Sequence, residues 1–120
     1  MRPELIESVF YYHMATHDDI YQYMATDYVY SIEQARVQCG YATVNNVYEK
    51  QLKDDMPSFL FSETLKYMYL LLDNTSPFRN MDFVFSTEAH PFSIDQLHSY
   101  FTSNEIKAVY SLYSNWKFSY

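Results

Sequence analysis

Two glutamates stand at the start of the chain, where a helix is expected to begin. Glu4 directly follows Arg2 and Pro3, and Glu7 lies three residues further along the chain. Negative charge in the first turn is favoured by the helix dipole, and residues three apart share one face. On spacing alone, capping and solvation explain this pair better than chemistry does.

Glu63 is harder to explain as a solvated charge. It lies in the middle of the most apolar segment of the chain, residues 59–73, with Phe59 and Tyr67 one turn away on either side. A lone ionised carboxylate costs several kcal/mol there unless it is paired or faces a polar cavity. The sequence leaves two interpretations open: a structural pair with an arginine such as Arg2, or a carboxylate facing a polar site.

A third candidate site follows a short predicted strand, in the run Thr-Glu-Ala-His-Pro at residues 87–91. Thr87 offers a hydroxyl and a carbonyl oxygen beside the carboxylate of Glu88. Hard cations such as calcium prefer oxygen ligands of this kind. His90 precedes a proline and is better explained as a turn residue, and the other histidines lack the mutual spacing of a metal site.

Three helices are expected to position these residues. Pro3 suits a first helical position, and apolar residues recur at helical spacing over residues 3–15. A second helix is predicted from a cap at Asp18 to about residue 38, with Gly40 as its stop. A third, capped by Ser58, covers residues 59–73. It is apolar on nearly every side and should be buried all round.

The remaining elements are shorter. Residues 41–48 and 83–87 have strand character, residues 49–55 are expected to form a charged loop, and a last helix is predicted over 104–114. The fold class is therefore mainly α, with three main helices, short strands and a C-terminal helical tail. Two of the helices are expected to pack against more protein than these residues supply.

Composition excludes several classes of protein. The 120 residues are 48% apolar and carry a net charge of −7, which fits one acidic globular domain. No basic cluster could bind nucleic acid, and no apolar stretch is long enough to span a membrane. Cys39 is the lone cysteine, so no disulfide can form within these residues. Pairing of Cys39 with a cysteine upstream of them stays an open alternative. Gly40 is the lone glycine, which excludes phosphate loops and dinucleotide-binding motifs.

No secretory signal is expected at the N-terminus, because Arg2, Glu4 and Glu7 interrupt any apolar core. Two explanations follow from this: a cytosolic protein, or a segment whose true N-terminus lies upstream.

Three ordered segments suggest a family. RPELIES (2–8), SFLFSETLKYMYLLLD (58–73) and FSTEAHPF (85–92) resemble the C-terminal part of the class I α-1,2-mannosidases, glycoside hydrolase family forty-seven. CGYAT (39–43) resembles the branch of ER degradation-enhancing α-mannosidase-like proteins. The resemblance implies that residues 1–92 are the C-terminal part of an (α/α)7 catalytic barrel, and residues 93–120 an unmatched tail. An inner barrel helix would be apolar on all sides, as residues 59–73 are.

The resemblance also implies roles for single residues. Glu4 matches the catalytic base that activates water, and Thr87 matches the direct protein ligand of a calcium ion through its hydroxyl and carbonyl. Five further residues match positions around the sugar and the waters of the calcium: Arg2, Glu7, Phe59, Glu63 and Glu88.

The implied function is a calcium-dependent, inverting α-1,2-mannosidase that trims high-mannose N-glycans on misfolded glycoproteins in the ER lumen, with an oxidoreductase as a candidate partner. An inverting glycosidase needs a general acid opposite its base. The family's acid lies in earlier segments without a counterpart here, so the 120-residue chain alone should be inactive. Two alternatives stay open: a glycan-binding quality-control factor that hydrolyses nothing, and a small helical interaction protein with a coincidental likeness.

The isolated chain is also expected to be poorly behaved. It should expose Leu65, Met68 and Leu72 where barrel neighbours belong, and therefore aggregate or stay partly molten.

Overall fold

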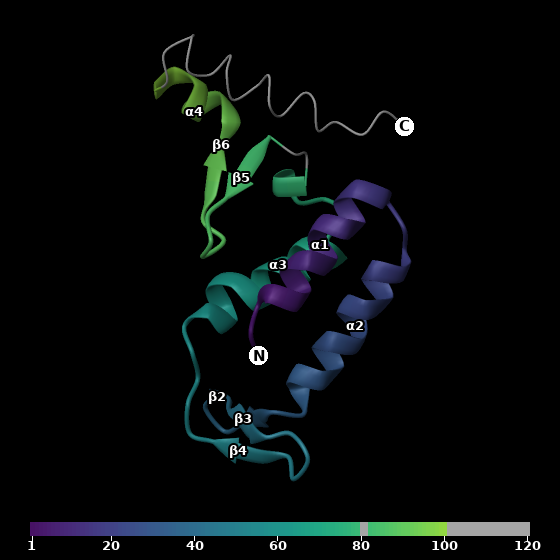
Figure 1. Cartoon of the computed structure of the whole chain (residues 1–120), viewed down its shortest axis with the longest axis vertical. Helices are drawn as coiled ribbons and strands as arrows, with labels where there is room; N and C mark the ends of the chain where they lie inside the picture. The colour runs from purple at the N-terminus through teal and green to yellow at the C-terminus, as the bar shows by residue number, and fades with distance from the viewer. Residues whose placement is uncertain (80–81, 101–120) are drawn as a thin grey trace.

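Three helices form the centre of the molecule. The computed structural model describes residues 1–79 and 82–100. Helix α1 (Glu4–Thr16) and helix α2 (Ile20–Glu33) are followed by a π-helical turn η1 (Leu60–Thr64) that continues into α3 (Leu65–Leu72) (Figure 1). The three predicted helices are thus confirmed. The helix predicted over 104–114 lies outside the described residues.

Helices α1 and α3 run in the same direction. At their N-terminal ends the hydroxyl of Thr64 donates to the carbonyl oxygen of Met1 at 3.0 Å. Near their C-terminal ends, Nη2 of Arg79, which follows α3, lies 2.8 Å from Nε2 of His13 in the last turn of α1. The short connection between α1 and α2 makes α2 antiparallel to both, so one helix covers a parallel pair (Figure 1).

The core lies where the three helices meet, because each helix turns its apolar stripe inward. Aromatic rings join the helices to the strand that follows: the ring of Tyr67 lies 5.5 Å from that of Phe10 and 6.0 Å from that of Phe85. The buried core cluster consists of Ile6, Val9, Phe10, Ala25, Ile32, Leu60, Tyr67, Met68, Leu70, Leu71 and Ala89.

Helix α2 ends five residues before the predicted position. The chain turns after Ile32, whose carbonyl accepts from the amide of Ala35 at 2.9 Å. A small antiparallel hairpin follows, in which β1 (Arg36–Val37) pairs with β2 (Gly40–Tyr41). Gly40 is therefore not a helix stop. It has φ +136° within the hairpin, and a Cβ there would meet the sulfur of Met56 at 2.8 Å.

The loop predicted over 49–55 is partly wrong. Strand β4 (Gln51–Lys53) pairs with β3 (Thr43–Asn46) in an antiparallel hairpin. Oδ1 of Asn46 accepts hydrogen bonds from the backbone amides of Tyr48 and Glu49, and these bonds close the turn between the two strands. All three residues of β4 are exposed, so no apolar alternation marked this strand in the sequence.

A third hairpin lies at the opposite end of the helices (Figure 1). Strand β5 (Phe83–Phe85) falls within the predicted strand, and it pairs with β6 (Pro91–Ser93). Pro91 therefore opens a strand in addition to ending the preceding turn. A 3-10 turn η2 (Pro77–Arg79) leads into this hairpin, and helix α4 (Ile94–Tyr100) follows it. None of the helices in the described part of the chain is long and apolar enough to span a membrane.

The third helix is not buried all round. Met68 is 4% exposed because it faces the core, so the expectation that it would be exposed is wrong. Leu72, at 44%, is exposed as expected, while Phe61 and Tyr69 are also exposed although burial was predicted for this helix. One flank of the helix therefore lacks a covering neighbour within the described residues.

Separate expression of the 120-residue chain should give an associating or loosely packed species. Besides the flank of α3, the large side chains of Ile20, Tyr23 and Tyr30 are exposed on α2. Apolar area of this extent favours association. We expect strong binding of a hydrophobic dye and a sedimentation coefficient that rises with concentration. A cooperative melt together with monomeric sedimentation would contradict this prediction.

Candidate active site

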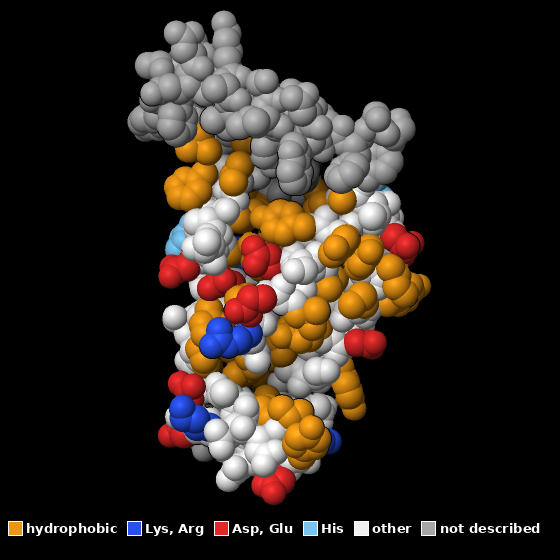
Figure 2. All heavy atoms as spheres, viewed as in Figure 1, with side chains coloured by type: hydrophobic (Ala, Val, Ile, Leu, Met, Phe, Trp, Pro, Cys, Tyr) orange, Lys and Arg blue, Asp and Glu red, His pale blue; other side chains and the backbone are white. Residues whose placement is uncertain are grey.

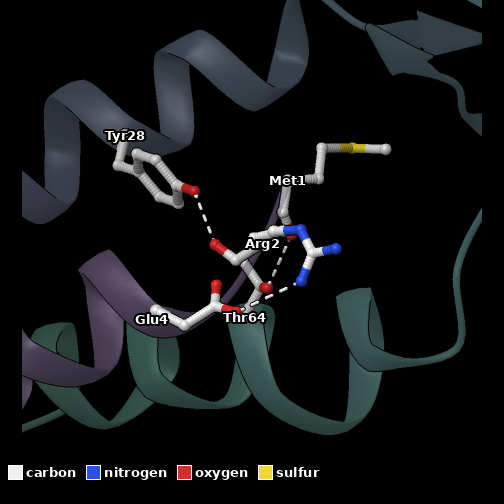
Figure 3. Close-up of polar contacts among 5 residues, drawn as sticks. All are labelled: Met1, Arg2, Glu4, Tyr28 and Thr64. Atoms are coloured by element: carbon white, nitrogen blue, oxygen red, sulfur yellow. Dashed lines mark hydrogen bonds and ion pairs between the residues drawn. The ribbon is translucent and has the colours of Figure 1, made fainter. Parts of the chain in front are cut away.

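The start of α1 is tied to both other helices. Pro3 adopts helical φ and ψ as the N-cap residue and is buried, in keeping with its fixed φ. The hydroxyl of Tyr28 donates to the carbonyl of Arg2 at 3.1 Å, and that of Thr64 donates to the carbonyl of Met1 (Figure 3). Burial, followed by the charge of Glu4, raises the pKa of Tyr28 and keeps this hydroxyl a neutral donor.

Glu4 projects from this anchored segment into solvent. Its Oε1 lies 3.4 Å from Nη1 of Arg2, and the two side chains are 64% and 80% exposed (Figure 3). An ion pair this exposed contributes little to stability, so both groups are available to a ligand. The structural alternative of an Arg2–Glu63 pair is wrong, because the arginine pairs with Glu4.

Glu7 lies one turn further along α1 and is half-buried. The hydroxyl of Tyr67 donates to its Oε1 at 3.3 Å. Burial first, then the neighbouring Tyr11 and Glu7, raise the pKa of Tyr67 far above its usual range. Tyr67 therefore remains a neutral donor that orients the carboxylate of Glu7.

Glu63 is 8% exposed and sits in η1, just before α3 begins. None of the ion pairs between described residues includes it. Burial raises its pKa most strongly, followed by the negative charges of Glu88, Glu7 and Glu4, while Lys66 opposes the shift. Carboxylates from α1, η1 and the β5–β6 turn thus converge around Glu63.

Figure 2 shows this acidic region from outside. Asp and Glu side chains gather over the N-terminal ends of α1 and α3, with hydrophobic side chains around them. Phe59 lies at the N-terminal end of η1, one turn before Glu63, and is partly buried. An aromatic ring beside a group of carboxylates is a suitable setting for a sugar, whose C–H face packs on rings while its hydroxyls accept and donate hydrogen bonds.

The turn that carries Thr87 and Glu88 is shaped by Ser86. Its hydroxyl accepts the amides of Glu88 at 3.2 Å and His90 at 3.1 Å, and its carbonyl accepts the amide of Ala89 at 2.9 Å. The amide of Ser86 in turn donates to the carbonyl of His90. His90 therefore acts as a turn residue, as the sequence suggested.

Thr87 is exposed, and its hydroxyl and carbonyl oxygens have no hydrogen-bond partner among residues 1–79 and 82–100. The described residues include no group of three or more His, Cys, Asp or Glu side chains that could hold a metal. A cation here would therefore depend on the two threonine oxygens, on single carboxylates and on water. Calcium accepts such a ligand set readily.

Three residues that shape the site were not recognised in the sequence analysis. Lys66 donates from Nζ to the carbonyl of Ala89 at 2.6 Å, Tyr67 orients Glu7, and Ser86 organises the turn. The three-residue spacing from Glu63 to Lys66 could have indicated a shared face. The roles of Tyr67 and Ser86 depend on tertiary contacts that spacing does not reveal.

A shallow groove continues from the site along α1. It is lined by Glu7, Ser8, Tyr11, Tyr12 and Ala15. The groove joins the oriented carboxylate of Glu7 to two exposed tyrosine rings, so this face of α1 offers both polar and aromatic contacts to a ligand.

Comparisons with known proteins agree with the resemblance in the sequence. The sequence profile of Glycosyl hydrolase family 47 matches residues 1–94. ER degradation-enhancing alpha-mannosidase-like protein 1 of Saccharomyces cerevisiae is 39% identical over 99 residues, which are 80% of this chain and 12% of that protein. Human endoplasmic reticulum mannosyl-oligosaccharide 1,2-alpha-mannosidase is 40% identical over 100 residues, covering 78% of this chain and 14% of that protein.

A solved structure is similar as well. The alpha-1,2-mannosidase from Trichoderma reesei superposes with a TM-score of 0.71 at 40% sequence identity, covering 78% of this chain and 21% of that one. The chain thus spans no more than about a fifth of the length of these relatives.

Proposed function

The chain belongs to glycosyl hydrolase family 47, and from that premise we propose that it supplies part of an α-1,2-mannosidase site that processes high-mannose N-glycans in the ER. One observation carries the proposal: Glu4 and Glu7 of α1, Glu63 of η1 and Glu88 of the β5–β6 turn converge on one region. The sequence resemblance assigns these four residues to the base and the sugar site. Membership also removes the alternative of a coincidental likeness.

Glu4 is the proposed general base. Its carboxylate is exposed at the anchored start of α1, where it can accept a proton from a water molecule on one face of the sugar. In an inverting reaction the general acid stands opposite, about 6.5–9.5 Å away. That acid belongs to barrel segments which this chain does not match, so the 120 residues alone are proposed to bind sugar without hydrolysing it.

The residues fit a bound calcium ion. Thr87 would hold it through its hydroxyl and carbonyl oxygens, which no described residue engages, while Glu63 and Glu88 would accept hydrogen bonds from its waters. The mutual repulsion of the carboxylates around Glu63 also favours a cation at this position. When bound, calcium would supply a Lewis-acidic anchor for two neighbouring sugar hydroxyls.

Removing calcium or its threonine ligand should therefore abolish sugar processing. With the full native polypeptide, we expect chelation to stop mannose release, and Thr87→Val to weaken calcium binding by at least about 10- to 100-fold. Valine keeps the shape of the side chain and removes only the hydroxyl. Titration calorimetry with calcium measures the affinity, and Thr26→Val, an exposed threonine on α2, is the control. Normal calcium affinity in Thr87→Val would refute the assignment.

A second candidate function is a glycan-binding quality-control factor without hydrolysis. It is favoured because the sequence resemblance assigns six of the seven proposed site residues to sugar or calcium binding and only Glu4 to chemistry. Mannose-release and glycan-binding assays on the same preparation of the full native polypeptide separate the two functions. Binding without release would favour the factor.

The ER lumen, misfolded glycoproteins and an oxidoreductase remain proposals for compartment, substrate and partner. The names of the relatives in yeast and human support the compartment. Cys39 is exposed and is a free thiol among the described residues, so it is accessible to a redox partner or to a cysteine elsewhere in the protein.

A further inference from the structure

The turn between β5 and β6 has an unusual backbone at Ala89. This residue has φ +56°, a left-handed conformation that non-glycine residues rarely adopt, and its side chain is fully buried in the core cluster. Surrounding contacts must hold such a conformation in place.

One hydrogen bond between described residues links this turn to α3. The backbone amides of Glu88, Ala89 and His90 all donate hydrogen bonds to Ser86. These bonds shape the turn but do not attach it to the helices. Besides the burial of the Ala89 side chain, the polar attachment is the charge-assisted bond from Nζ of Lys66 to the carbonyl oxygen of Ala89, at 2.6 Å.

The position of Lys66 on the helix allows it to make this hydrogen bond. It follows Glu63 by three residues, so both side chains lie on one face of the η1–α3 segment. The same face thus presents a carboxylate to the site and an ammonium group to the turn. Lys66 is also partly buried, which limits competition from water for its hydrogen bond.

We propose that Lys66 is a positioning residue: it fixes the turn of residues 86–90 against α3 and so holds the oxygens of Thr87 and the carboxylate of Glu88 beside Glu63. The attachment of the turn is inferred from the hydrogen bond between Lys66 and Ala89 alone. Its effect on calcium affinity rests on the proposed function.

The sign of the effect on calcium distinguishes positioning from simple charge. If Lys66 acted only as a nearby positive charge, its removal would relieve repulsion and strengthen calcium binding. If it acts through the carbonyl of Ala89, its removal loosens the turn and weakens binding. Loss of a group that orients a metal site typically lowers affinity by about 10- to 100-fold.

The test uses the full native polypeptide with Lys66→Met, Lys66→Arg and the control Lys53→Met. Methionine keeps an apolar stem and removes the ammonium group, arginine keeps a charged donor, and Lys53 is exposed on β4 beside Asp55, away from the turn. Hydrogen exchange of the peptide that contains residues 86–90, measured without calcium, reports on the turn. Calorimetric titration with calcium reports on the site.

We expect faster exchange at the turn and about 10- to 100-fold weaker calcium binding in Lys66→Met. Lys66→Arg should lie close to the wild type, and Lys53→Met should match it. Unchanged exchange in Lys66→Met, or calcium binding that is equal or tighter, would overturn the proposal. If the wild type binds no calcium, the proposed function loses its cation, while the exchange result still decides whether Lys66 fixes the turn.

Discussion

Replacing Glu4 with glutamine is expected to lower mannose release by the full native protein by about 10²–10⁴-fold, the usual contribution of a general base. Glutamine keeps the size and hydrogen-bonding reach of the side chain but cannot accept the proton of the attacking water. The start of α1 should stay in place, because Tyr28 and Thr64 hold it through backbone carbonyls and not through Glu4.

Glu33→Gln is a matched control for this substitution. Glu33 lies 3.4 Å from Arg36 at the surface, the same separation as in the Arg2–Glu4 pair, but it is not one of the carboxylates around Glu63. Its Oε1 also accepts a hydrogen bond from the hydroxyl of Tyr41, which the amide oxygen of glutamine can still accept. Both variants should melt at the wild-type temperature, since exposed ion pairs contribute little. Only Glu4→Gln should lose activity. Normal mannose release by Glu4→Gln would exclude Glu4 as the base.

Glycan affinity adds a second measurement. Glu4→Gln should still bind high-mannose glycans, because Phe59, Glu63 and the groove along α1 are unchanged. Retained binding with lost release therefore assigns Glu4 to chemistry. If the wild type already binds glycans without releasing mannose, the quality-control factor becomes the better account.

The helices were predictable because their signals are local. Pro3 at the start of α1, apolar residues at helical spacing and the apolar run of residues 59–73 each act within one element. Glu63 was also singled out correctly as a carboxylate under strain, because a charge inside an apolar run needs an explanation wherever the chain folds. Its burial and raised pKa agree with that argument.

Elements that depend on pairing were less predictable. Strand β4 is exposed along its length and exists because β3 lies beside it, so the sequence offered only a charged loop. Helix α2 ends early because residues 36–41 form a hairpin in place of another helical turn. Gly40 belongs to that hairpin. In each case a contact with a neighbouring segment overrides the local preference.

In the candidate site, too, local sequence signals were predictive and tertiary contacts were not. Residue types singled out Glu63 and Thr87, and the sequence resemblance added a role for Glu4. The hydrogen bonds around these residues, by contrast, come from tertiary packing. Tyr67 reaches Glu7 across sixty residues of sequence, and Lys66 reaches Ala89 across twenty-three. Periodicity within one helix carries no information about such partners.

Tyr67 is the residue whose loss should damage both the core and the site. It is 1% exposed, its ring packs against Phe10 and Phe85, and its hydroxyl donates to Glu7. Tyr67→Ala removes a large buried ring and leaves a cavity, so we expect the free energy of unfolding to fall by about 3–5 kcal/mol. Urea denaturation of the full native protein measures this change.

Two further variants separate the contributions of the ring and the hydroxyl. Tyr67→Phe keeps the ring and should cost only about 1 kcal/mol, while weakening glycan binding because Glu7 loses its orienting donor. Tyr30→Ala, at a position that is 71% exposed, should stay within about 0.5 kcal/mol of the wild type. Equal destabilisation by Tyr67→Ala and Tyr30→Ala would show that α1 and β5 do not pack around this ring, and it would contradict the arrangement of carboxylates that depends on this packing.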